Sequence, residues 1–170
     1  MAAIISNQKP LFNLTSFSWK LDLRLECLPL ITKSKMNVRE AINFGLNKLN
    51  FDDIRKNQRK VVEAYLSGRD VLMISPTGSG KSLTFHIAPF PIDFFKHGKR
   101  DDIQTVCLVI FPLVSLMNDH VSSLREKGIK AVVVGPDSSE TENKEASEGK
   151  YNLVFTSPEA SVVIGPRFSH

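Results

Sequence analysis

The chain has few of the residues that mark several specialised protein classes. Only two of its 170 residues are cysteines, and glycine and proline number nine each. A disulfide-rich miniprotein needs many more cysteines, and a collagen-like or low-complexity chain needs far more glycine and proline. No apolar stretch reaches the roughly 18 residues of a membrane span, so we expect no membrane partner. What is present is an ordinary globular composition, with 42% hydrophobic and 24% charged residues.

The net charge of +4 is small and unevenly distributed. Residues 1–35 hold five basic and two acidic residues, whereas residues 36–170 are almost balanced. Overall charge therefore does not by itself indicate a nucleic-acid partner. Residues 1–35 also lack a sustained hydrophobic period. We predict that they form a disordered leader or are translated from an upstream start, and that residues 36–170 form the folded part.

Helical and strand-like patterns alternate beyond residue 35. Apolar residues recur at helical spacing over residues 36–49, 55–66 and 114–124. Four short apolar runs are each typical of a strand buried on both faces of a parallel sheet: residues 71–74, 106–111, 131–134 and 153–155. The stretches between them are long enough for crossover connections. The pattern predicts an α/β fold with a parallel sheet.

A glycine-rich segment, SPTGSGKS at residues 75–82, follows the first expected strand and precedes an expected helix. A triphosphate carries several closely spaced negative charges, so its binding loop must present many backbone N–H groups at once. Gly78 and Gly80 permit that approach, Lys81 is the expected catalytic cation on the phosphates, and the Ser82 hydroxyl is expected to bind Mg²⁺. The residues assigned to ATP here are Thr77, Gly78, Ser79, Gly80, Lys81 and Ser82.

The segment departs from the strict phosphate-loop pattern at one position, since residue 75 is serine where that pattern has glycine.

Upstream, Phe51, Arg55 and Gln58 are spaced so that a ring, a guanidinium and a carboxamide could converge on one base. Glutamine can bind adenine bidentately through N6 and N7, which would select ATP over GTP. The alternative is that Phe51 packs in the core and that Arg55 and Gln58 begin a solvated helix.

Taken together, residues 51–85 closely resemble the RecQ family of superfamily 2 DNA helicases. The segment FPLVSLMNDHV at residues 111–121 resembles that family's motif Ia, and TSPE at residues 156–159 resembles its Ser-Pro-Glu segment. DEAD-box RNA helicases fit less well, because they carry a Pro-Thr-Arg-Glu-Leu type sequence where this chain has Pro-Leu-Val-Ser-Leu. The resemblance covers residues 38–159 and implies a partial RecA-like lobe. It also implies DNA contacts at Pro112, Ser115, Asn118, Ser157 and Pro158.

The resemblance further implies an ATP- and Mg²⁺-dependent helicase that moves 3′ to 5′ and acts in DNA repair and recombination, in the nucleus if the source is eukaryotic. Its expected partners are single-stranded or partly duplex DNA and a second helicase lobe. The family's Asp-Glu-x-His segment, which holds Mg²⁺ and positions water, does not occur in the 170 residues. We therefore expect an amino-terminal piece that binds nucleotide without unwinding DNA. The alternatives are a non-hydrolysing ATP-binding regulatory module and a P-loop kinase of small molecules.

Overall fold

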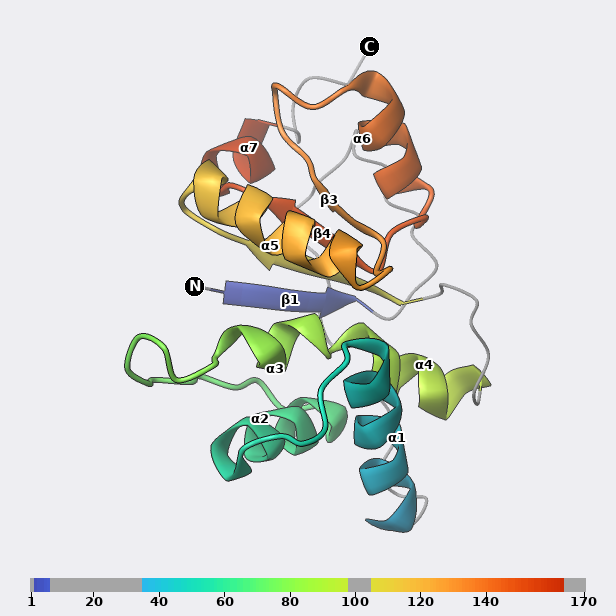
Figure 1. Ribbon diagram of the computed structural model, residues 1–170. Coiled ribbons are helices and arrows are strands. Elements are labelled where there is room, and N and C mark those ends of the chain that lie inside the picture. Colours follow the sequence, from blue (N-terminus) through green and yellow to red (C-terminus); the bar gives the residue numbers. More distant parts are fainter. Residues whose placement is uncertain (1, 7–34, 98–104, 164–170) are drawn as a thin grey trace. The chain divides into compact units, whose positions relative to one another are not determined.

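The computed structural model describes residues 2–6, 35–97 and 105–163 (Figure 1). The chain divides into two compact units. We call residues 1–23 together with 103–170 the sheet unit, and residues 24–102 the loop unit.

The sheet unit contains four strands in the spatial order β1-β2-β4-β3. Their bounds are β1 Ala2–Ser6, β2 Val106–Ile110, β3 Ala131–Val133 and β4 Leu153–Thr156. Strands β2, β4 and β3 run parallel, and β1 pairs antiparallel with the outer edge of β2. The parallel α/β fold expected from the sequence is confirmed for these three strands, whose ends differ from the predicted ranges by one residue at most.

Three helices accompany this sheet (Figure 1): α5 Val114–Glu126, α6 Glu140–Ser147 and α7 Pro158–Val163. Ala146 of α6 belongs to a buried cluster with Val132 and Val154. The imidazole of His120 in α5 stacks on Phe155 instead, with ring centroids 5.9 Å apart. Because successive side chains of a strand point to opposite faces, α5 and α6 cover opposite faces of the sheet.

Two titratable side chains pack inside the sheet unit. His120 also meets Phe111 edge-on at 5.2 Å, and burial lowers the pKa of its imidazole although neighbouring Asp119 raises it. Cys107 of β2 is fully buried, and desolvation raises the pKa of its thiol to about 12. A thiol with that pKa is unreactive near neutral pH. Both residues therefore serve packing in this unit.

The loop unit contains four described helices: α1 Lys35–Lys48, α2 Lys56–Leu66, α3 Ser82–His86 and α4 Pro89–His97. Helix α1 packs along α4. A Cβ atom added at Gly45 of α1 would lie 2.6 Å from the Ile87 side chain and 3.3 Å from Phe90, so glycine is needed for this close approach. None of the helices in the described ranges is both long and apolar enough to cross a membrane.

Strand β1 lies in a segment for which the sequence predicted no structure. The run Ala-Ala-Ile-Ile at residues 2–5 is apolar and includes two β-branched residues, which favour strands. The edge of β2 offers unpaired N–H and C=O groups, and residues 2–6 satisfy them in a regular register. Residues 7–34 of the predicted leader lie outside the described residues, and the boundary at residue 35 stays a prediction.

The strand predicted at residues 71–74 is wrong. This stretch has no regular secondary structure, and Leu72 and Ile74 are 87% and 89% exposed. An apolar run becomes a buried strand only where neighbouring strands supply hydrogen bonds on its edges. No described strand pairs with these residues. The phosphate loop therefore follows an irregular segment that is largely exposed.

Candidate nucleotide-binding site

The turn at residues 76–80 takes the shape that the glycines allow. Gly78 and Gly80 have φ angles of +76° and +80°, in the left-handed region that other residues rarely adopt. The backbone N–H of Ser79 donates to the Pro76 carbonyl at 3.3 Å and closes the turn. Helix α3 begins at Ser82, directly after Lys81. The expected loop-then-helix arrangement is present, although the preceding strand is not.

The start of α2 is hydrogen-bonded to this loop. The Arg55 guanidinium donates from Nη1 to the Ser79 carbonyl at 2.8 Å, and Gln58 donates from Nε2 to the Gly80 carbonyl at 2.7 Å. The Gln58 Oε1 atom accepts the backbone N–H of Arg55 at 2.8 Å and so caps the helix. Gln58 is only 4% exposed. The structure thus brings together two residues that sequence analysis placed in one site with the loop.

The Lys81 ammonium is folded back across the loop. Its Nζ donates to the carbonyl oxygens of Ser75 and Pro76, each at 2.7 Å. A phosphate oxygen is a stronger acceptor for an ammonium than a neutral carbonyl, because the acceptor is itself charged. The Lys81 ammonium could therefore exchange these carbonyls for phosphate oxygens.

Ser82 is the first residue of α3 and is partly buried. Its hydroxyl is a hard oxygen ligand of the kind Mg²⁺ prefers. No group of three or more histidine, cysteine, aspartate or glutamate residues in the described ranges could hold a metal ion. The Ser82 hydroxyl could hold Mg²⁺ together with phosphate oxygens, as the serine or threonine of other phosphate loops does.

Two further residues predicted for the ATP site are exposed. Phe51 is 40% exposed and lies between α1 and α2, where its backbone N–H donates to the Leu46 carbonyl. Thr77 is exposed at the tip of the loop. A base could reach the exposed Phe51 ring, but its placement there stays a prediction.

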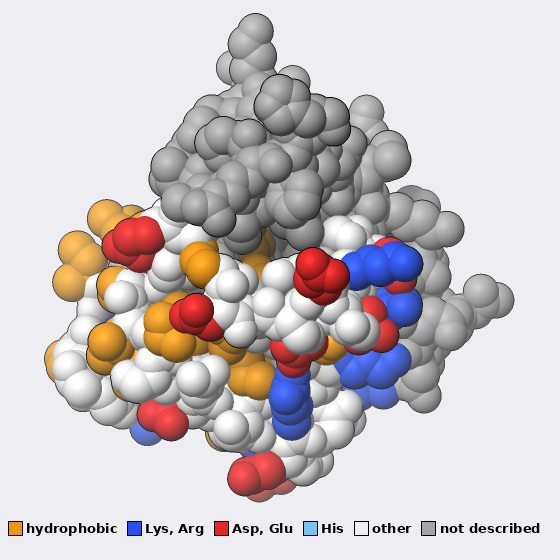
Figure 2. Space-filling view, turned by 90° about the horizontal axis from the view of Figure 1, so that it is seen from above, with side chains coloured by type: hydrophobic (Ala, Val, Ile, Leu, Met, Phe, Trp, Pro, Cys, Tyr) orange, Lys and Arg blue, Asp and Glu red, His pale blue; other side chains and the backbone are white. Residues whose placement is uncertain are grey.

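The two units differ in charge. The described part of the loop unit holds ten basic and six acidic residues, whereas residues 105–160 of the sheet unit hold five basic and eight acidic ones. A positive balance suits the binding of a triphosphate. On the face shown in Figure 2, acidic side chains lie among the basic ones, so the coloured side chains there do not form a continuous basic surface. Any DNA contact by the sheet unit must therefore depend on local groups.

The residues predicted to contact DNA follow two neighbouring parallel strands. Pro112 lies in the connection from β2 to α5, and Ser157 lies between β4 and α7. The N–H of Phe111 donates to the Thr156 carbonyl at 2.9 Å, so the two strands end side by side. Ser157 caps α7 by accepting the Ala160 N–H at 3.1 Å. The other three predicted residues are exposed: Ser115 and Pro158 on the first turns of α5 and α7, and Asn118 on the second turn of α5.

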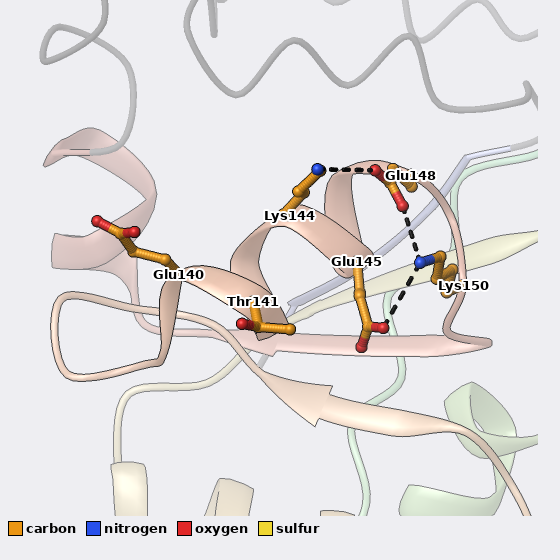
Figure 3. A pocket seen from close by; sticks show the side chains of 6 residues that line it. All are labelled: Glu140, Thr141, Lys144, Glu145, Glu148 and Lys150. Atoms are coloured by element: carbon orange, nitrogen blue, oxygen red, sulfur yellow. Dashed lines mark hydrogen bonds and ion pairs between the residues drawn. The ribbon is translucent and has the colours of Figure 1, made fainter.

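A shallow pocket lies beside α6 (Figure 3) and is lined by Glu140, Thr141, Lys144, Glu145, Glu148 and Lys150. Lys150 bonds to Glu148 at 2.9 Å and lies 3.5 Å from Glu145. The hydrogen bond lowers the pKa of the Glu148 carboxyl and raises the pKa of the Lys150 ammonium. Lys150 partly compensates these two carboxylates at an exposed surface.

Comparison with known proteins identifies the wider family. The model of the DEAD/DEAH box helicase family matches residues 55–165, which include the phosphate loop and both predicted DNA segments. This chain belongs to the DEAD/DEAH box helicase family.

Similar curated proteins include several that are named RecQ or Q-like helicases. The chain is 34% identical over 136 residues to the ATP-dependent DNA helicase RecQ of Haemophilus influenzae, a match that covers 77% of this chain and 20% of that protein. It is 33% identical over 121 residues to the ATP-dependent DNA helicase Q-like 4B of Arabidopsis thaliana, covering 66% and 10%. It is 35% identical over 109 residues to the ATP-dependent helicase SGS1 of Saccharomyces cerevisiae, covering 62% and 7%.

These matches confirm the resemblance to RecQ helicases that the motifs indicated. They also show that the chain spans a fifth or less of the length of these three curated relatives. The family match favours a helicase over the small-molecule kinase that the phosphate loop alone left open.

Sequence analysis missed features in both units of this helicase-family chain. It named Ser75 only as a departure from the loop pattern, although the Ser75 Oγ donates to the Ser79 Oγ at 2.6 Å. It also counted Val114 among the apolar residues at helical spacing and gave no separate role to Leu113 and Leu116, whereas Leu113, Val114 and Leu116 are 53%, 54% and 43% exposed at the start of α5. The unusual serine was a signal for the first feature. The second had none, because apolar residues at helical spacing are usually buried.

Proposed function

We propose that this chain is the ATP-binding part of a RecQ-type, ATP-dependent DNA helicase. The observation that carries the proposal is the phosphate loop held by α2. Gly78 and Gly80 form the turn, and the Lys81 ammonium bonds to the carbonyl at the start of the loop. Arg55 and Gln58 bond to the carbonyls of residues 79 and 80 near its end. The RecQ-type relatives supply the substrate class, since two of the three reported above are named ATP-dependent DNA helicases.

The loop would bind phosphates through groups that it already presents. Backbone N–H groups around the two glycines would donate to phosphate oxygens, as they do in loops of this type. The Lys81 ammonium would leave the Ser75 and Pro76 carbonyls and bind the β- and γ-phosphates. Ser82 would hold Mg²⁺, which neutralises charge on the phosphates. Positioning and charge compensation are the main contributions that a protein makes to phosphoryl transfer.

The adenine base would lie against Phe51, Arg55 and Gln58. Gln58 already uses both ends of its carboxamide, one on the Gly80 carbonyl and one on the Arg55 N–H. Reading adenine N6 and N7 would therefore require these two bonds to be shared or exchanged. In this proposal base recognition and loop position are linked through one side chain.

Gln58→Ala should narrow the preference for ATP over GTP by about one to two decades, because a bidentate base contact gives roughly 1–3 kcal/mol of discrimination. The substitution should also weaken the binding of both nucleotides, since the Gly80 carbonyl loses its hydrogen-bond donor. Competition binding of ATP and GTP measures both effects. An unchanged ATP-to-GTP ratio with weaker binding of both would leave Gln58 as an anchor of the loop alone.

The sheet unit would bind single-stranded DNA at the edge where β2 and β4 end. Pro112, Ser115 and Asn118 at the start of α5, with Ser157 and Pro158 at the start of α7, would contact the backbone without reading sequence. We further propose that the motor moves 3′ to 5′, works with a second helicase lobe, and acts in DNA repair and recombination in the nucleus of a eukaryote.

The decisive experiment uses the 170-residue chain. We expect ATP binding that strengthens with Mg²⁺ in calorimetry, but no phosphate release with or without single-stranded DNA. The reason is that the 170 residues contain no Asp-Glu-x-His segment to position the attacking water. Failure to bind ATP would overturn the proposed function. DNA-stimulated phosphate release that disappears in Lys81→Ala would overturn the expected inactivity and leave the ATP site intact.

A further inference from the structure

The phosphate loop of this chain contains a hydrogen bond that the strict loop pattern does not allow. That pattern has glycine at position 75, which carries no hydroxyl. Here the Ser75 Oγ donates to the Ser79 Oγ at 2.6 Å, a short bond between two partly buried side chains. The bond joins the first residue of the loop to the residue just before Gly80. It therefore closes the loop across its base, independently of the turn formed by the backbone.

Ser79 is held at two of its atoms. Its carbonyl accepts from the Arg55 guanidinium at 2.8 Å, and its hydroxyl oxygen accepts from Ser75. A hydroxyl has one proton to donate as well as lone pairs to accept. Either hydroxyl can donate in this pair, but when a phosphate oxygen takes the Ser79 proton, Ser75 is the donor within the loop. Phosphate oxygens accept hydrogen bonds and have none to donate at this charge state.

The bond also matters when Lys81 moves. Lys81 now holds the Ser75 carbonyl at 2.7 Å, and binding phosphate would remove that contact. The Ser75–Ser79 hydroxyl bond does not involve the ammonium, so it can persist during this exchange. The two ends of the loop would then stay together while the cation changes partners.

We propose that Ser75 is a positioning residue for nucleotide binding, which orients the Ser79 hydroxyl as a donor to a phosphate oxygen. This inference rests on the proposed function, because it needs a phosphate in the loop. It assigns Ser79 a direct contact with phosphate, and it assigns Ser75 an action through Ser79. In this interpretation the hydroxyl of Ser75 contributes to phosphate binding, although the residue replaces the glycine of the strict loop pattern.

The test compares two substitutions of nearly equal shape in the 170-residue chain. Ser75→Thr keeps the hydroxyl, whereas Ser75→Val replaces it with a methyl group. Calorimetry should give wild-type ATP affinity for Ser75→Thr and affinity about 3- to 10-fold weaker for Ser75→Val, the range expected for one hydrogen bond. Inorganic triphosphate should show the same loss, because the contact is made to phosphate and not to the base.

Ser79→Ala provides the second half of a double-mutant cycle. Ser79→Ala should lower the affinity for ATP at least as much as Ser75→Val does. Adding Ser75→Val to it should cause no further loss of affinity, since Ser75 acts through Ser79. Additive losses, or equal affinities of Ser75→Val and Ser75→Thr, would overturn the inference. Thermal unfolding checks each variant, and Ser75→Ala replaces Ser75→Val if the latter does not fold.

The outcomes separate this inference from the proposed function. If the wild-type chain does not bind ATP, both are overturned. If it binds ATP and Lys81→Ala abolishes that binding while Ser75→Val leaves it unchanged, only the role of Ser75 is overturned.

Discussion

Lys81→Ala should weaken ATP binding to the 170-residue chain by about 100-fold or more, because charge-assisted hydrogen bonds to phosphate are the strongest contacts in such a loop. The ammonium lies across the loop and is held by two carbonyls at 2.7 Å. Its removal leaves the phosphates without their nearest cation. Titration calorimetry with ATP measures the effect, and the melting temperature without nucleotide shows whether the fold survives.

Lys60→Ala is the matched control for this prediction. Lys60 lies exposed on α2 and carries the same charge, so its removal changes the general field of the loop unit by the same amount. We expect its effect on ATP affinity to be small and to vanish at high salt, as for other exposed charges. Equal losses from both substitutions would show that Lys81 contributes only general charge.

Gly80→Ala should disrupt the loop and reduce ATP affinity by more than 10-fold. Gly80 has a φ of +80°, where a residue with a Cβ atom is strained by roughly 1–2 kcal/mol. That Cβ would also lie 2.7 Å from the Gln58 Nε2 atom, which donates to the Gly80 carbonyl. Either the loop or Gln58 must move, and both bind the nucleotide in our proposal. Melting temperature and ATP calorimetry together measure the result.

Gly78→Ala separates the effect of strain at a positive φ from the effect of the close approach of Gln58. Gly78 has nearly the same φ, +76°, yet a Cβ there would meet nothing within 4 Å. We expect the melting temperature to fall less than in Gly80→Ala. In a Gln58→Ala background, the drop caused by Gly80→Ala should shrink to that of Gly78→Ala. If the two glycines behave alike in both backgrounds, the close approach of Gln58 has no energetic consequence.

The sequence predicted the sheet where apolar runs have partners within the described residues. The runs at 106–111, 131–134 and 153–155 became β2, β3 and β4, because β4 lies between β2 and β3 and pairs with both. Residues 71–74 have the same apolar pattern but no described partner, and they form no regular secondary structure and are largely exposed. The hydrophobic pattern of the sequence indicates which side chains favour burial. It does not indicate which backbone N–H and C=O groups are available to pair with a strand.

The site was predictable where spacing along the chain is short. Residues 75–82 form a contiguous motif, and Arg55 and Gln58 lie on one helical turn. The bonds from these two residues to the loop span 24 and 22 positions, so only folding reveals them. The bond between Ser75 and Ser79 was hidden for another reason. A pattern that treats serine 75 as a missing glycine does not consider what its hydroxyl contacts.

The pairing of β1 with β2 bears on the order in which the chain folds. Ile4 pairs with Leu108, 104 positions away, whereas Leu108 pairs with Val154 only 46 positions away. The additional loop-closure entropy is small, roughly 0.6 kcal/mol per doubling of loop length, but pairing between distant segments slows folding. Residues 2–6 are synthesised before β2 and can pair with it only after β2 has been made. Once β2 has been made, its edge is open to any other extended segment until residues 2–6 dock and protect it from misassembly.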